Sequence, residues 1–164
     1  MNQISFLGPI RPTRARDLRA GDEILFPSDV VPGAVLRAVI TDLMENEEDR
    51  TITINGELIG EEALFSHEAP PLELVDRVVQ AGESRPDGRT VIVRGDELWK
   101  WIGEKFNDPH GSTEKFVIGA FDRCVNPDTG EPMVEVKLHS LSNRRKIVTA
   151  GLEPSATIIF AETR

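Results

Sequence analysis

The chain has 164 residues, of which 39% are apolar, and a formal net charge of -9. This length fits one domain of usual size or two small ones, and the apolar content favours a folded core over disorder. The negative charge makes nucleic acid an unlikely ligand and opposes attraction to anionic membranes, because both are bound mainly through Lys and Arg.

A single cysteine, Cys124, excludes a disulfide framework within the chain, and three histidines leave few ligands for a structural zinc site. The sequence has neither a secretory signal nor an apolar stretch long enough to span a membrane. We therefore expect a cytoplasmic protein with no cofactor and no metal.

Short strands dominate the expected structure. Residues 17–26 are predicted to form a turn and a strand, and residues 35–54 a hairpin with the acidic run 45–49 at its tip. Residues 51–54 alternate polar and apolar side chains, as in a half-buried strand. Further strands are predicted at 74–79, 90–93, 116–121, 133–138, 147–148 and 156–160.

Two segments favour short helices. Residues 60–65 can form a helical turn, and residues 97–106 place apolar side chains at helical spacing, with Asp96 as the predicted N-cap. The predicted fold class is therefore mainly β with one or two short helices (α+β), built as small β-barrel-like units.

The order of these elements repeats along the chain. Gly21-Asp22-Glu23 resembles Gly95-Asp96-Glu97, and a competing register instead matches Arg50-Thr51-Ile52 with Arg89-Thr90-Val91. Two longer pairs of segments also correspond, 38–54 with 117–136 as strand, acidic turn and strand, and 69–79 with 152–160 as a final strand led by proline.

Two domain organisations follow from this pattern. One is a tandem duplication, with β-rich units at 1–80 and 81–164 and the helix near 97–106 in the second. The polar segment 80–88 is the expected linker. The other is one single mixed domain whose turns recur in type.

No segment has the spacing of a nucleophile elbow, a phosphate loop or a calcium loop, so we do not expect an enzyme. Arg94-Gly95-Asp96 is interpreted as a turn and a helix cap rather than as an adhesion motif. His67, His110 and His139 lie on different elements, without the spacing of metal ligands.

Trp99, Lys100 and Trp101 are the candidate interface. Tryptophan is frequent at interface hot spots, and these are the two tryptophans of the chain. We expect one of them in the core and take the other, if it is exposed beside Lys100, as the contact residue.

Arg144, Arg145 and Lys146 are candidate anion contacts, because they concentrate positive charge in an acidic chain. The competing interpretation is a charged hairpin turn between Leu141 and Ile147.

Residues 17–24 (Asp-Leu-Arg-Ala-Gly-Asp-Glu-Ile), the paired strands after them and the ending Pro-Pro-Leu-Glu-Leu-Val-Asp-Arg-Val-Val resemble small acidic β-barrel proteins of unknown function from actinobacterial bacteriophages. The resemblance covers residues 17–79 best and fades in the second half. It implies a phage origin, and the family has no catalytic residues to transfer.

The expected function is a non-enzymatic phage accessory protein that binds an unidentified host or viral protein. Two alternatives stay open. The first is a protein that binds or sequesters an anionic small molecule or nucleotide, and the second is a virion structural component. The sequence leaves the oligomeric state open, homo-oligomers included.

Overall fold

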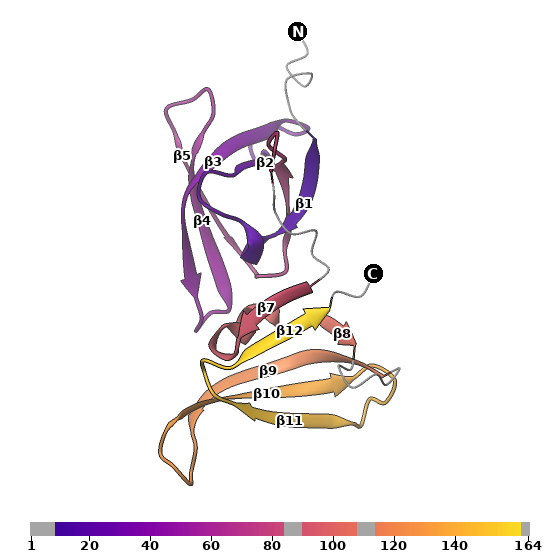
Figure 1. Cartoon of the computed structure of the whole chain (residues 1–164). Helices are drawn as coiled ribbons and strands as arrows, with labels where there is room; N and C mark the ends of the chain where they lie inside the picture. Colours follow the sequence, from indigo (N-terminus) through magenta and orange to yellow (C-terminus); the bar gives the residue numbers. More distant parts are fainter. Residues whose placement is uncertain (1–8, 84–89, 108–113, 162–164) are drawn as a thin grey trace. The chain divides into compact units, whose positions relative to one another are not determined.

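The computed structural model describes residues 9–83, 90–107 and 114–161. The chain is mainly β with short helices, which confirms the predicted fold class. It divides into two compact units, Met1–Ser84 and Arg85–Arg164, which we call the N-terminal unit and the C-terminal unit (Figure 1). The division falls inside the polar segment 80–88.

One antiparallel sheet of six strands forms the N-terminal unit, in the order β1-β6-β2-β3-β4-β5. The 3-10 helix η2 (Ala15–Asp17) follows the first strand. The hairpin predicted at 35–54 is confirmed as two of these strands. The strands are β1 (Ile10–Arg14), β2 (Glu23–Pro27), β3 (Val35–Asn46), β4 (Thr51–Leu58), β5 (Leu64–Ala69) and β6 (Leu74–Val78).

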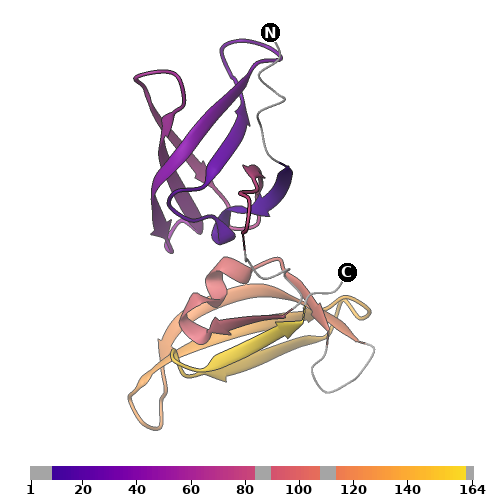
Figure 2. The ribbon, with the colours of Figure 1, turned by 45° about the horizontal axis from the view of Figure 1, so that its top comes forward.

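Two antiparallel sheets form the C-terminal unit, a four-stranded one in the order β11-β10-β9-β8 and a two-stranded one of β12 and β7. The 3-10 helix η3 (Gly95–Trp101) lies beside β7 and contacts β9 and β10 (Figure 2). The strands are β7 (Thr90–Arg94), β8 (Lys105–Asn107), β9 (Lys115–Val125), β10 (Pro132–Ser140), β11 (Ile147–Leu152) and β12 (Thr157–Ala161).

The helix predicted at 97–106 is wrong in its type and its bounds. The residue at the N-cap of η3 is Arg94, and Asp96 lies inside the helix instead of capping it. The chain turns at Gly103, whose φ is 91°, and then enters β8. A positive φ ends a helix and favours glycine, so the apolar periodicity here spans a helix, a turn and a strand.

The barrel-like prediction also needs correction, because the sheets of the described residues are not closed. The edge strands of the six-stranded sheet, β1 and β5, do not pair with each other. Side chains bring β5 toward β2 instead, with the rings of Phe26 and Phe65 centred 5.0 Å apart. Packing rather than a backbone ladder therefore covers this side of the interior.

The two units have the same order of elements, and four of the five strand pairings of the N-terminal unit recur; its β2–β6 pairing has no counterpart among the described residues of the C-terminal unit. The pair β1–β6 matches β7–β12, and the ladders from β2 to β5 match those from β8 to β11. Each unit has one irregularity at the same place, where Thr41 of β3 and Gly119 of β9 are left out of the pairing. The buried residue before each irregularity is Ile40 or Ile118.

This repeat corrects the pairing of the two Gly-Asp-Glu stretches. The Gly21 N–H donates to the Ile40 carbonyl at 2.8 Å, and the Gly103 N–H donates to the Ile118 carbonyl at 2.7 Å. Gly21 therefore corresponds to Gly103, and Gly95 corresponds to Ala15, since each of these two begins its 3-10 helix.

The longer matches, 38–54 with 117–136 and 69–79 with 152–160, are confirmed as equivalent hairpins and final strands. The competing register of residues 50–52 with 89–91 is wrong, because it sets the fourth strand of one unit against the first of the other.

Candidate functional site

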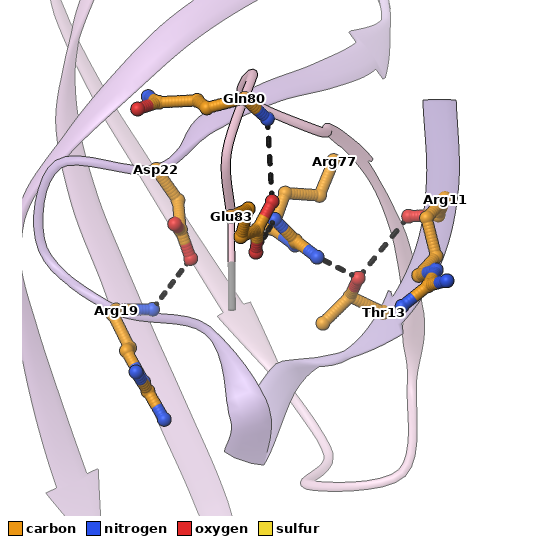
Figure 3. A network of polar contacts seen from close by, with 7 residues as sticks. All are labelled: Arg11, Thr13, Arg19, Asp22, Arg77, Gln80 and Glu83. Atoms are coloured by element: carbon orange, nitrogen blue, oxygen red, sulfur yellow. Dashed lines mark hydrogen bonds and ion pairs between the residues drawn. The ribbon is translucent and has the colours of Figure 1, made fainter. Parts of the chain in front are cut away.

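A polar cluster lies inside the N-terminal unit (Figure 3). Arg77 on β6 is 2% exposed, and its guanidinium donates to Thr13 Oγ1 at 3.1 Å and to Glu83 Oε1 at 2.6 Å. The Gln80 N–H donates to the other Glu83 oxygen at 3.2 Å. A buried guanidinium needs such partners, so the cluster fastens the segment after β6 to the sheet and serves the fold.

The candidate interface predicted at Trp99, Lys100 and Trp101 is buried, with exposed fractions of 3%, 9% and 5%. All three lie in η3, and the Lys100 ammonium is 6.0 Å from the ring centre of Trp99 and 3.8 Å from Glu97 Oε2. The condition set for a contact residue, an exposed tryptophan beside Lys100, is therefore not met, because η3 packs against β7, β9 and β10.

The basic residues Arg144, Arg145 and Lys146 are exposed in the loop between β10 and β11. Asn143 shapes this loop, since its side-chain oxygen accepts the Arg145 N–H at 3.1 Å and its carbonyl accepts the Lys146 N–H at 3.0 Å. Lys146 Nζ lies 2.9 Å from Glu114 Oε2.

The Glu114 carboxylate is fixed by two side chains. A hydrogen bond from Lys146, and to a smaller extent one from Ser140, lowers the pKa of Glu114 below its usual 4.5. The positive charge of Lys146 is therefore already paired within the C-terminal unit.

The remaining candidate residues do not form a reactive group. In the N-terminal unit, His67 Nε2 lies 2.7 Å from Glu73 Oε2. In the C-terminal unit, the ring of His139 lies over Gly119, and His110 falls outside the described residues. Arg123, next to Cys124, donates to the Asp96 carbonyl at 3.1 Å.

Within residues 9–83, 90–107 and 114–161, no three His, Cys, Asp or Glu side chains form a group that could hold a metal ion. In the same ranges no helix is long and apolar enough to cross a membrane.

Exposed apolar side chains gather at one end of the N-terminal unit. They lie in the β2–β3 loop, at the start of β3, after β4 and at the start of β5. We call them the apolar end: Val30 at 88% exposed, Val31 at 55%, Val35 at 60%, Ile59 at 42% and Leu64 at 85%.

Backbone contacts place these residues on the same end of the sheet. Val35 is opposite Pro27 in the β2–β3 register, and the Ile59 N–H donates to the Arg37 carbonyl at 2.8 Å. Leu64 directly precedes Phe65, whose ring packs on Phe26. The β2–β3 and β4–β5 loops are therefore neighbours, and sequence reasoning missed this surface because its members are 34 positions apart at the extremes.

The rim of the apolar end is acidic. Asp29, Glu61 and Glu62 lie in the same two loops and are exposed. The whole N-terminal unit is acidic as well, since residues 1–84 hold 16 acidic and 7 basic side chains, whereas residues 85–164 hold 12 of each. The net charge of the chain thus resides in the unit that presents the apolar end.

No family model matches the chain, and no curated protein matches it.

Proposed function

We propose that the protein is a non-enzymatic accessory protein that binds another protein through the apolar end of its N-terminal unit. The observation that supports this proposal is the exposure of five apolar side chains in two neighbouring loops and at the starts of the strands that follow them. Apolar groups that gather on a surface within a polar rim are typical of protein–protein contacts.

The partner, on this proposal, presents an apolar patch bordered by Lys or Arg. Asp29, Glu61 and Glu62 surround the apolar end, and charges at a rim mainly set partner choice and the rate of association. The resemblance of residues 17–79 to actinobacterial phage proteins supports a host or viral protein as this partner, met in the cytoplasm of the infected cell.

The test compares three forms of the protein. Val30→Glu combined with Leu64→Glu places two charges in the apolar end, whereas the control, Met44→Glu with Val125→Glu, changes two residues that are 53% and 60% exposed elsewhere. Each form is incubated with an actinobacterial lysate, recaptured and analysed by quantitative mass spectrometry. The affinity of any stoichiometric partner is then measured by calorimetry with purified proteins.

We expect the partner to bind the wild type and the control equally, and the apolar-end variant at least about 30-fold more weakly, because each buried glutamate costs about 1–2 kcal/mol or more. A partner that all three forms hold equally would contradict the proposed surface. The absence of any stoichiometric partner would contradict the proposed function.

A second candidate function is the binding of an anionic small molecule at the basic loop. It is supported by the shape of that loop, in which Asn143 fixes the turn while Arg144 and Arg145 remain exposed. Phosphate or a nucleotide would then raise the melting temperature by linkage, and Arg144→Ala with Arg145→Ala would abolish the rise. An equal rise in both forms would contradict this function.

A further inference from the structure

Strand β11 is an open edge of the four-stranded sheet. It pairs with β10 on one side, and no strand of the described residues pairs with its other side. Its sequence, Ile-Val-Thr-Ala-Gly-Leu, contains neither a charged residue nor a proline. Ile147 and Val148 are 52% and 38% exposed. An edge of this kind offers unpaired backbone groups to another strand.

The equivalent edge of the N-terminal unit differs. Strand β5 has the sequence Leu-Phe-Ser-His-Glu-Ala, and Glu68 accepts a hydrogen bond from Thr51 at 2.7 Å on the neighbouring strand. A charge on an edge strand opposes the addition of a further strand. Of these two equivalent edge strands, only β5 therefore contains a charged residue.

A second copy of β11 fits this edge in one symmetric register. In an antiparallel pair, two residues that face each other both direct their backbone N–H and C=O groups toward the partner strand, or both direct them away. Two copies of one strand can therefore pair symmetrically only about a two-fold axis at a residue that faces itself. A centre at Thr149 sets Ile147 opposite Gly151, and it brings Arg145, in the turn before β11, toward Glu153, which directly follows β11. A centre at Ala150 would instead set Ile147 opposite Glu153.

Charge therefore selects the register centred on Thr149. Arg145 and Glu153 are both exposed, and they flank β11 at its two ends. The two-fold axis would produce the Arg145–Glu153 contact twice, once at each end of the paired strands. Opposite charges on facing positions stabilise a strand pair, and like charges destabilise it.

We propose that the protein self-associates by antiparallel pairing of β11 with β11 of a second copy, about a two-fold axis at Thr149. The contact joins two sheets of four strands into one of eight. It is independent of the apolar end and of the function proposed for that surface. One strand pair buries a small area, so the dimer is weak, with a Kd on the order of 0.1 mM.

Sedimentation equilibrium from about 0.02 to 1 mM tests the contact. Thr149→Glu places two carboxylates face to face in the dimer, whereas in the monomer the new side chain lies opposite Lys137 of β10, which favours the folded state. The matched control is Ser66→Glu at the equivalent position of β5, where Ser66 pairs with Asn55. We expect Thr149→Glu to weaken the dimer at least about 10-fold and the control to leave it unchanged.

Charge reversal tests the register. Arg145→Glu and Glu153→Arg should each weaken the dimer about 10-fold, because each places like charges together at both ends. The double reversal should restore the Kd to within about 3-fold of the wild type. Full-strength dimers in both single variants would overturn the register.

Cysteine cross-linking gives an independent reading of the axis. In a Cys124→Ser background, a short bifunctional thiol reagent should cross-link Thr149→Cys between two copies and should not cross-link Ser66→Cys, since the two Thr149 Cβ atoms would lie about 5 Å apart. A wild type that stays monomeric at about 1 mM overturns the proposal. A dimer that survives Thr149→Glu but is lost in the Val30→Glu and Leu64→Glu variant also overturns it, and assigns self-association to the apolar end.

Discussion

Removal of the Glu83 carboxylate should destabilise the N-terminal unit strongly. The Arg77 side chain is 3% exposed and its guanidinium lies 2.6 Å from Glu83, whose own side chain is 15% exposed. Loss of one partner of a buried ion pair costs about 3–5 kcal/mol. Because Glu83 is the outer member and water can partly replace it, we expect Glu83→Ala to lower the free energy of unfolding by about 2–3 kcal/mol.

The expected loss of stability in Glu83→Ala arises because Arg77 is left as a buried charge without Glu83. Arg77→Met combined with Glu83→Ala removes both charges from the interior, so we expect it to cost about 1 kcal/mol or less, and to be more stable than Glu83→Ala alone. Glu62→Ala is the matched control, because it removes an exposed carboxylate from the same acidic unit. That change should shift stability by less than about 0.5 kcal/mol.

Two spectroscopic probes separate the units during urea unfolding. The chain has no tyrosine, and both tryptophans, Trp99 and Trp101, lie in the C-terminal unit, so tryptophan fluorescence reports on that unit alone. Circular dichroism reports on the strands of both units, so the N-terminal transition is the one seen by circular dichroism and not by fluorescence. With a urea m-value of about 1.2 kcal/mol/M, Glu83→Ala should move the midpoint of that transition down by about 2 M. The fluorescence midpoint should stay in place.

Either of two results would refute this reasoning. A loss below about 1 kcal/mol would mean that water or a neighbouring group solvates Arg77 as well as Glu83 does. A double variant as unstable as Glu83→Ala would mean that the stabilisation comes from other contacts of residue 83 and not from the charge it neutralises.

Three further predictions concern single side chains. Gly56→Ala should destabilise the N-terminal unit by about 2 kcal/mol or more in urea unfolding, because the new Cβ would lie 2.4 Å from the Val39 carbonyl oxygen. Gly21→Ala meets no atom within 4 Å but has a φ of 93°, so backbone strain alone should cost about 1–2 kcal/mol, and a loss equal to that of Gly56→Ala would contradict this distinction. Lys146→Met should raise the pKa of Glu114 toward 4.5 in a carboxyl NMR titration. An unchanged titration would contradict the assigned cause. Since the folded-state pKa of Glu114 is lowered, its contribution to stability is present above about pH 4.5 and is lost as the pH falls through the folded pKa.

Runs of apolar residues, together with the alternation in residues 51–54, predicted most strands, and the sequence showed part of the repeat of elements. The match of residues 69–79 with 152–160 has the register that the two final strands show, because proline and the apolar residues after it keep their spacing. The Gly-Asp-Glu match failed, because η2 has three residues and η3 has seven. This difference in length falls between Ala15 and Gly21 in one unit and between Gly95 and Gly103 in the other. Gly21 therefore corresponds to Gly103 and not to Gly95.

The candidate interface at residues 99–101 could not be judged from sequence alone. Tryptophan is common both in protein interiors and at contact surfaces, and only the packing of η3 decided between them. A signal for the apolar end did exist. Val30 and Val31 lie together between two prolines, in a loop, where polar residues are usual. The sequence alone could not show that this loop is a neighbour of the β4–β5 loop, because that depends on strand pairing.

The first and the last strand of each unit pair with each other. Ile10 is opposite Val78 in one unit, and Thr90 is opposite Ala161 in the other. The start of the first strand and the end of the last strand are therefore about 5 Å apart, one strand spacing. A segment with adjacent ends can be excised, permuted or inserted into a surface loop of an unrelated host protein without cutting a ladder, so each half of this chain is suited to transplantation as a single cassette.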